Sequence, residues 1–197
     1  MLSFPGELVL EDERVLLRPL QPTDLVFLIP FAEQEPDIWM YSAVNAAGQE
    51  GMKNYVEFAM RQKGLQKEIP FIVFDKKANA YAGSTRFYDI ERAFSTTQLG
   101  YTWYGKNFQR TGLNRHCKLL MLGYAFEQWG MERVEFRADN RNEKSVRAMQ
   151  SIGCTVEGIL RSNMTSTQGG RRDSIVLSIL KKEWFDSVKK NLQEKTR

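Results

Sequence analysis

The loop at residues 109–114 carries the clearest chemistry in the sequence. It reads Gln109-Arg110-Thr111-Gly112-Leu113-Asn114 and lies between a predicted strand and a predicted long helix. The first N–H groups of a helix lack intrahelical partners, and together with the helix dipole they favour a bound phosphate. Gly112 would let the backbone approach the anion closely, and Arg110 and Arg115 would add positive charge. The pattern indicates a phosphate or pyrophosphate site, although a lone glycine before a helix also occurs in ordinary connecting loops.

The length and composition predict one domain, spanning residues 1–197. A chain of 197 residues with 42% hydrophobic and 26% charged residues can bury a full core without disulfides or metal. Its cysteines, Cys117 and Cys154, lie far apart and form no metal-type cluster, so we expect both to be small buried residues and predict no metal.

Hydropathy and charge bear on where the protein is located and on its partners. No stretch approaches the ~20 apolar residues of a membrane span, and no secretory signal is visible, so a cytoplasmic location with no membrane partner is expected. The net charge of +4 would suit an anionic ligand or nucleic acid. We predict no nucleic-acid partner, because acidic residues interrupt the C-terminal lysine pairs and no stacking-aromatic motif accompanies them.

Hydrophobic periodicity predicts the elements that position the loop. Strands are expected at residues 6–10, 15–18, 71–74, 81–90 and 98–103, the last three forming an antiparallel meander, with helices at residues 23–31 and 49–62. After residue 105, helices at residues 113–129, 142–152 and 182–192 alternate with strands at residues 133–136, 154–161 and 172–180. This order implies local parallel pairing with crossover helices in a mixed α+β domain.

Nearly the whole chain resembles the GNAT superfamily of N-acetyltransferases, most strongly from residue 99 to residue 184. The motif at residues 109–112 is similar to the start of the family's pyrophosphate loop, Q/R-x-x-G-x-G/A. In the same order, Leu99-Gly100-Tyr101-Thr102-Trp103 resembles the fourth strand, Asn142-Glu143-Lys144-Ser145 the start of the fourth helix, and the segments at residues 152–161 and 172–184 the last strands and tail. The tail is similar to that of the branch that includes the ribosomal-protein N-terminal acetyltransferases. One departure is Asn114, where the family has a small residue, and its side chain could crowd the pyrophosphate or donate to it.

The resemblance implies a GNAT-type acyl-CoA N-acyltransferase fold, with a central mixed sheet of six to seven strands flanked by helices. It also implies acetyl-CoA as co-substrate, no metal, and direct transfer of acetyl to a primary amine. In the family the fourth and fifth strands splay apart, and the pantetheine arm adds to the sheet. The resemblance therefore places pantetheine at Tyr101, Thr102 and Trp103, with Asn142 beside it. It places the pyrophosphate at Gln109, Arg110, Thr111, Gly112, Leu113, Asn114 and Arg115.

The catalytic groups are less regular than the cofactor loop. Many members of the family place a tyrosine four residues beyond the N-x-x-S/A serine or alanine, but this chain has Met149 there. The resemblance makes Ser145 a proton donor or hydrogen-bond donor to the leaving thiolate, although Ser145 could equally cap or pack its helix. Many members also carry a glutamate where this chain has Gln98, which can orient a water but cannot usefully accept a proton. Candidates for the base are Asp89, Glu91, Glu135 and the single histidine, His116.

The missing base suggests which amine is acetylated. Deprotonating a lysine side chain at neutral pH requires roughly 4–5 kcal/mol, whereas an α-amine requires about 1 kcal/mol. We therefore expect a protein N-terminus or a small-molecule amine as the partner, and the sequence leaves a homodimer open. An acceptor groove would be formed by the first helices and the last hairpin, with Trp39, Met40, Tyr41, Phe58, Arg161 and Met164 as candidates, although each of them could equally be core. Because Gln98 and Met149 depart from the family pattern, a non-catalytic acyl-CoA-binding module is the alternative.

Overall fold

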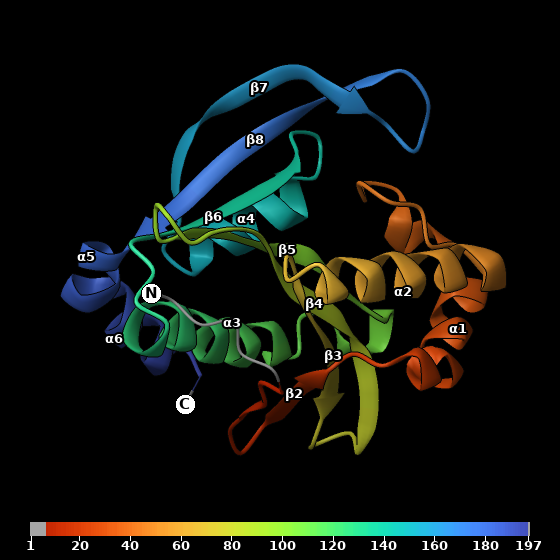
Figure 1. The fold of residues 1–197 in the computed structure, drawn as a ribbon, viewed down its shortest axis with the longest axis horizontal. Helices are drawn as coiled ribbons and strands as arrows, with labels where there is room; N and C mark the ends of the chain where they lie inside the picture. Colours follow the sequence, from red (N-terminus) through yellow and green to blue (C-terminus); the bar gives the residue numbers. More distant parts are fainter. Residues whose placement is uncertain (1–6, 197) are drawn as a thin grey trace.

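The computed structural model describes residues 7–196, which form one open, twisted sheet with helices on both faces (Figure 1). The sheet has the strand order β1-β2-β3-β4-β5-β6-β8-β7. The strands are β1 (Leu10–Glu11), β2 (Val15–Pro19), β3 (Ile69–Asp75), β4 (Ala80–Glu91), β5 (Thr96–Tyr104), β6 (Arg133–Asp139), β7 (Thr155–Thr165) and β8 (Arg171–Leu180).

The helices bury the two faces of the sheet in two separate clusters. On β3, Phe71 and Val73 pack in the cluster that contains α3, whereas Ile72 packs in the cluster that contains α1 and α2, as the alternation of a strand requires. The α-helices are α1 (Leu25–Gln34), α2 (Gly48–Gly64), α3 (Leu113–Gly123), α4 (Glu143–Ser151), α5 (Lys181–Glu183) and α6 (Lys189–Glu194). Short 3₁₀ turns are η1 (Pro22–Asp24), η2 (Pro36–Trp39) and η3 (Lys106–Phe108), and π-helical segments are η4 (Tyr124–Gln128) and η5 (Trp184–Val188).

The predicted mixed α+β class is confirmed, but the described part of the sheet has eight strands instead of six to seven. The strand expected at residues 6–10 begins only at Leu10, and residue 6 lies outside the described residues. The expected parallel pairing occurs between β5 and β6. It does not extend to β7, because β8 folds back on β7 as a hairpin and inserts between β7 and β6.

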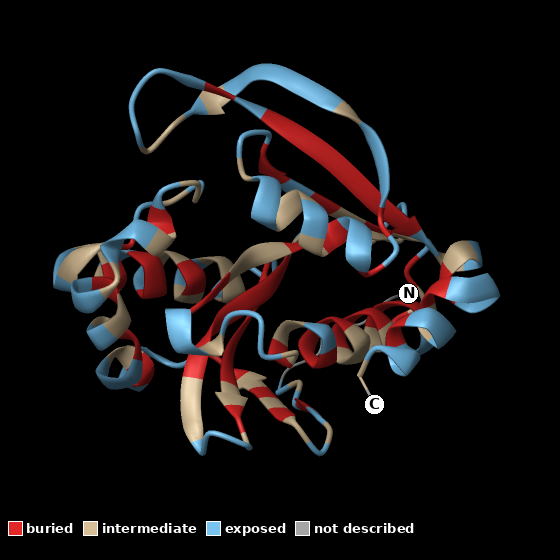
Figure 2. Ribbon diagram, turned by 180° about the vertical axis from the view of Figure 1, so that it is seen from behind, coloured by how far each residue is buried: buried red, intermediate tan, exposed pale blue. Residues whose placement is uncertain are grey.

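The hairpin of β7 and β8 forms the far edge of the molecule. Figure 2 shows that β8 is mostly buried and that β7 is exposed along most of its length. No helix in residues 7–196 has the length and apolar character needed to cross a membrane.

The helix predicted at residues 113–129 is regular only to Gly123. It then widens into the π-helical segment η4, where the N–H of Trp129 donates to the carbonyl of Tyr124 over 2.8 Å. The wider turn changes the direction of the side chains that follow, a change that a period of 3.6 residues does not predict. The closing helix contains the same feature at η5.

Candidate functional site

The site begins where β5 and β6 separate. Their parallel pairing joins Thr96, Thr97 and Gln98 to Arg133, Val134 and Glu135, and it stops there. Beyond that point β5 continues to Tyr104 beside β4, while β6 pairs only with β8 (Figure 1). The facing edges therefore present backbone N–H and C=O groups without a strand partner, which an extended ligand arm can satisfy.

A β-bulge lies on β5 just past the point of separation. The register between β4 and β5 shifts between Ser84 and Arg86, opposite Tyr101 and Thr102. Tyr101 has a φ of 48°, in the left-handed region that non-glycine residues rarely adopt. Such a bulge re-aims the backbone groups of the strand, and here it does so at the free edge of β5.

The loop after β5 leads directly into the N-terminus of α3. Arg110 has a φ of 63°, and Gly112, the N-cap residue, has a φ of 91°. A Cβ atom added to Gly112 would meet no atom within 4 Å, so the backbone faces open space at this point. The N-cap residue has no side chain to cap the helix, and the N–H of Leu113 makes only a long hydrogen bond of 3.4 Å to Thr111 Oγ1, which an anion can replace. Thr111 and Arg115 are exposed beside this N-terminus, whereas Leu113 is buried beneath it.

Internal hydrogen bonds hold the loop in place. Gln109 Nε2 donates to the carbonyl of Tyr104 over 2.9 Å, and Thr111 Oγ1 donates to the carbonyl of Phe108 over 2.8 Å. The Tyr104 hydroxyl donates to Asn114 Oδ1 over 3.2 Å. Burial raises the pKa of Tyr104 well above its ordinary value, so the phenol keeps the proton that it donates. The side-chain oxygen of Asn114 is thus tied back to the protein, which argues against crowding of the anion.

The start of α4 brings Asn142 and Ser145 together. Asn142 is the N-cap residue, and its Oδ1 accepts a hydrogen bond from the N–H of Ser145 over 3.1 Å. This bond occupies the carbonyl oxygen of Asn142 and leaves its amide NH₂ group for a ligand. Ser145 thus contributes to the cap through its backbone N–H. Its hydroxyl makes no hydrogen bond among the described residues.

Three of the candidate bases line one pocket with Gln98, where β5 and β6 are still paired. Gln98 Nε2 donates to Asp89 Oδ2 over 3.0 Å, and Gln98 Oε1 is buried without a partner among the described residues. Because a buried amide oxygen needs a donor, it is suited to hold a water. The pocket encloses about 250 Å³ and is lined by Asp89, Glu91, Thr96, Thr97, Gln98, Arg133 and Glu135.

Hydrogen bonding separates the carboxylates of this pocket. Both oxygens of Glu135 are occupied, Oε2 by Arg133 Nη2 at 2.8 Å and Oε1 by Arg137 Nε at 2.7 Å. With both oxygens bonded to guanidinium groups, Glu135 has no oxygen placed to receive a water or an amine. Asp89 and Glu91 are the better candidates in this pocket.

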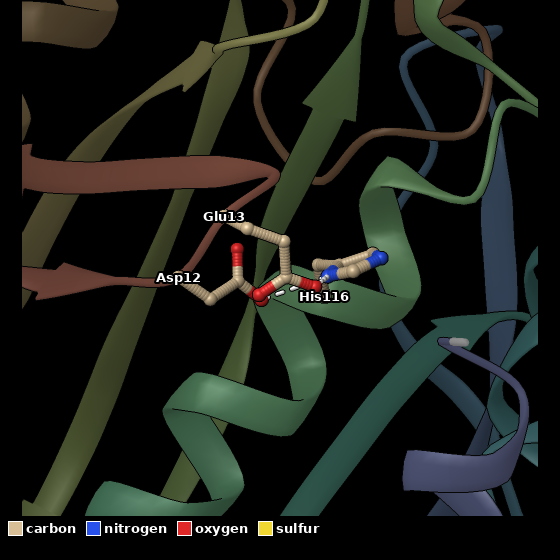
Figure 3. A group of neighbouring side chains, drawn as sticks. All are labelled: Asp12, Glu13 and His116. Atoms are coloured by element: carbon tan, nitrogen blue, oxygen red, sulfur yellow. Dashed lines mark hydrogen bonds and ion pairs between the residues drawn. The ribbon is translucent and has the colours of Figure 1, made fainter.

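His116 lies away from the pocket, against the turn between β1 and β2 (Figure 3). Its Nδ1 is 2.7 Å from Asp12 Oδ2, and Asp12 Oδ1 accepts hydrogen bonds of 2.8 Å from the N–H groups of Arg14 and Val15. Glu13 completes a group whose ligand atoms lie within 4.8 Å of one another, which sequence reasoning did not find. Because these hydrogen bonds account for both oxygens of Asp12, we assign the group as a tether between the turn and α3. It places His116 outside the candidate catalytic groups.

The residues expected in an acceptor groove divide into two sets. Trp39 is only 2% exposed and packs against Tyr55 and Trp103, so it belongs to the core. The following segment does meet the last hairpin, since the carbonyl of Met40 accepts from Thr167 Oγ1 at 3.0 Å and the carbonyl of Tyr41 accepts from Arg172 Nη1 at 3.2 Å. Phe58 and Met164 are half-buried, and Arg161 is exposed.

Sequence reasoning missed two buried cations that flank the bulge. Arg86 of β4 is fully buried, and its Nη1 donates to Glu68 Oε2 over 2.6 Å. Lys118 of α3 is 5% exposed, and its Nζ donates to Thr102 Oγ1 over 3.0 Å. A signal for Lys118 was present, because it lies at helical spacing with the buried Met121 and Leu122.

A family model described as "Acetyltransferase (GNAT) domain" matches residues 14–155. The chain belongs to the GNAT family of acetyltransferases. YdaF of Bacillus subtilis, provisionally named a ribosomal N-acetyltransferase, is 25% identical over 178 residues, covering 88% of this chain and 94% of YdaF. This GNAT protein is accordingly an acyl-CoA-dependent acetyltransferase, as predicted, which disfavours the alternative of a non-catalytic binding module.

Solved structures agree with the fold of this acetyltransferase. A protein of T. thermophilus that is provisionally named an acetyltransferase has a TM-score of 0.87 and 29% identity, covering 100% of both chains. The ribosomal-protein-S5-alanine acetyltransferase of Vibrio fischeri has a TM-score of 0.72 and 21% identity, covering 90% of this chain and 98% of its own, and it supports the fold alone.

Proposed function

We propose that this acetyltransferase transfers acetyl from acetyl-CoA directly to the free amine of a second bound substrate. The amine is a protein N-terminal α-amine or a small-molecule amine. The observation that carries the proposal is the separation of β5 from β6 after Gln98, with the bulge at Tyr101 on the free edge and the N-terminus of α3 at its end. A single domain of residues 1–197 and a cytoplasmic location are part of the same proposal.

The cofactor follows the free edge of β5 in this proposal. Backbone groups of Tyr101, Thr102 and Trp103 pair with the pantetheine arm and the acetyl oxygen. Trp103 can contact the cofactor only through its backbone, because its side chain is buried in the core. Asn142 offers its amide NH₂ group from the opposite side. A backbone donor placed at the developing oxyanion typically contributes about 3–4 kcal/mol to the transition state.

The pyrophosphate lies over the N-terminus of α3. The N–H groups from Gly112 to Asn114 would donate to it, with Arg110 and Arg115 adding charge. Gln109 and Thr111 hold the loop through their bonds to the backbone of Tyr104 and Phe108, so they act by positioning.

Proton removal from the amine is assigned to a water in the pocket at Gln98. The free Oε1 of Gln98 would orient this water, and Asp89, already bonded to Gln98, would accept its proton. Ser145 would donate a hydrogen bond to the leaving thiolate from the start of α4. Because this arrangement is weaker than a directly placed glutamate base, it suits an amine of low pKa.

An amine panel with detection of free thiol tests the proposal. At neutral pH, peptides with a free α-amine or small α-amines should be acetylated faster than peptides whose only amine is a lysine side chain. Peptides carrying the N-terminal sequences of ribosomal proteins belong in the panel, because YdaF is named for that class. Faster acetylation of lysine side chains would contradict the choice of amine. If none of the amines in the panel caused release of free thiol, acetyl transfer to this class of amine would be contradicted.

A further inference from the structure

Lys118 is a buried cation without an acidic partner. It is 5% exposed, and within residues 7–196 it forms no ion pair. Its Nζ donates to Thr102 Oγ1 over 3.0 Å, and that oxygen is 2.7 Å from Thr85 Oγ1. Both threonines lie at the bulge, so the ammonium contacts the segment of β5 that the proposed function assigns to the thioester.

The ammonium also interacts electrostatically with a thiol beyond the end of α4. This thiol belongs to Cys154. Burial raises its pKa, the positive charge of Lys118 partly opposes that rise, and the resulting pKa is about 12. The N–H of Cys154 donates to the carbonyl of Met149 over 3.1 Å. Met149 stands where the family resemblance expects a tyrosine, and its side chain cannot donate a proton.

The environment weakens the hold of the Lys118 side chain on its proton. Burial lowers its pKa to about 8, close to the value of about 8.5 for an ordinary thiol. The neighbouring titratable groups, Cys117 and Cys154, do not neutralise it, because burial raises their pKa values to about 11 and about 12. At neutral pH the lysine is therefore charged, while the two thiols are neutral. Because the pKa of the Lys118 ammonium is close to that of a thiol, proton transfer from Lys118 to a thiolate can be efficient.

We propose that Lys118 is the proton donor to the coenzyme A thiolate, an inference that rests on the proposed function. When the carbon–sulfur bond of the tetrahedral intermediate breaks, its electron pair stays on sulfur. The Lys118 ammonium gives one proton to that sulfur, which leaves as the free thiol, and neutral Lys118 regains a proton from water after product release. Ser145 then serves as a hydrogen-bond donor to sulfur and not as the source of the proton.

The experiment follows the thiol of bound coenzyme A, which requires no acceptor amine. The ultraviolet absorbance of the thiolate is titrated with pH in complexes of coenzyme A with the wild type, Lys118→Met and Lys118→Arg. The exposed Lys182→Met variant is the matched control, because it makes the same chemical change on the surface. Thermal scans with and without coenzyme A show that each variant is folded and binds.

In the wild type the bound thiol should ionise at a pH at least one unit below that of free coenzyme A, giving about tenfold more thiolate. Lys118→Met should abolish this shift, and Lys182→Met should keep it. Lys118→Arg should keep the shift, because the charge remains, but it should not restore turnover, because arginine does not release a proton at this pH. The rate of turnover should fall as pH rises above about 8 in the wild type, where Lys118 loses its proton, and this fall should be absent in Lys118→Met.

The two proposals fail differently. If the wild type does not bind coenzyme A, the proposed function is contradicted. If the wild type binds coenzyme A but the bound thiol titrates identically in the wild type and Lys118→Met, the role of Lys118 is wrong. Full turnover in Lys118→Arg would show that charge alone suffices and would overturn the proton-donor assignment.

Discussion

The two buried cations beside the β5 bulge differ in how the protein treats their charge. Arg86, on the side of α2, is bound to Glu68 and lies between aromatic rings, 4.2 Å from the ring centre of Tyr101 and 4.6 Å from that of Tyr55. Lys118, on the side of α3, has a hydroxyl as its one hydrogen-bond partner among residues 7–196. A buried charge with a counter-ion and flat rings around it is held as part of the structure. A buried charge without a counter-ion destabilises the fold, so its presence calls for a functional reason.

Removing Glu68 tests the structural half of this comparison and should have the largest effect. Glu68→Ala leaves Arg86 buried and unpaired, which should lower the free energy of unfolding by about 3–5 kcal/mol. Denaturant unfolding measures the change. The exposed pair of Glu143 and Arg147 is the control, since Glu143→Ala should cost no more than about 0.5 kcal/mol. Equal losses in both variants would mean that the Arg86 pair is no more structural than a surface pair.

Removing the charge of Lys118 should have the opposite sign. Lys118→Met should be more stable than the wild type at pH 7, by up to about 3 kcal/mol, because it removes the cost of a buried charge. Unfolding curves of the two proteins measure the difference, and a clear loss of stability would show that Lys118 is a structural residue.

The pH dependence of that difference has a defined direction. The pKa of Lys118 is lower in the folded protein than in the unfolded chain, so the unfolded chain binds more protons between pH 8 and about 10.5. The wild type should therefore gain stability relative to Lys118→Met as pH rises through this range. Paired unfolding curves at several pH values show it, and a constant difference would mean that Lys118 does not titrate as the structure indicates.

Removing the hydroxyl partner of Lys118 should have a smaller effect. Thr102→Val removes the acceptor of the bond from Nζ and should cost about 1.5–3 kcal/mol, as for other hydrogen bonds to a charged group. Thr102→Ser keeps the hydroxyl and is the control in the same unfolding measurements. If Thr102→Val and Thr102→Ser are equally stable, the bond does not hold the ammonium in place.

A change at the start of α4 should have the smallest effect and should leave both cations unaffected. Asn142→Ala removes the cap of α4 and should cost about 1 kcal/mol. The pH dependence of stability should remain that of the wild type, because neither Lys118 nor Arg86 is touched. A changed pH dependence would show that the start of α4 and the β5 bulge are coupled more closely than their contacts indicate.

The parts of the site that are local in sequence were predictable. The loop at residues 109–114 and the cap at Asn142 depend on neighbouring residues, so their residue types predict their conformations. The partners of Lys118 and Arg86 come from distant elements, and no local pattern reports them. The insertion of β8 between β6 and β7 was not predicted for the same reason, since the order of strands at the edge of a sheet depends on tertiary packing. His116 met a similar limit, because its partner Asp12 lies 104 residues away in sequence.

The short contact between β5 and β6 divides the sheet into two plates. Strands β1 to β5 form one plate and β6, β8 and β7 form the other, joined along their edges by pairing at only three positions in each strand. A pantetheine arm that forms hydrogen bonds with both β5 and β6 would hold the two parts of the sheet together. We therefore expect the cofactor to slow the exchange of amide hydrogens along both facing strands, at residues that it does not itself touch.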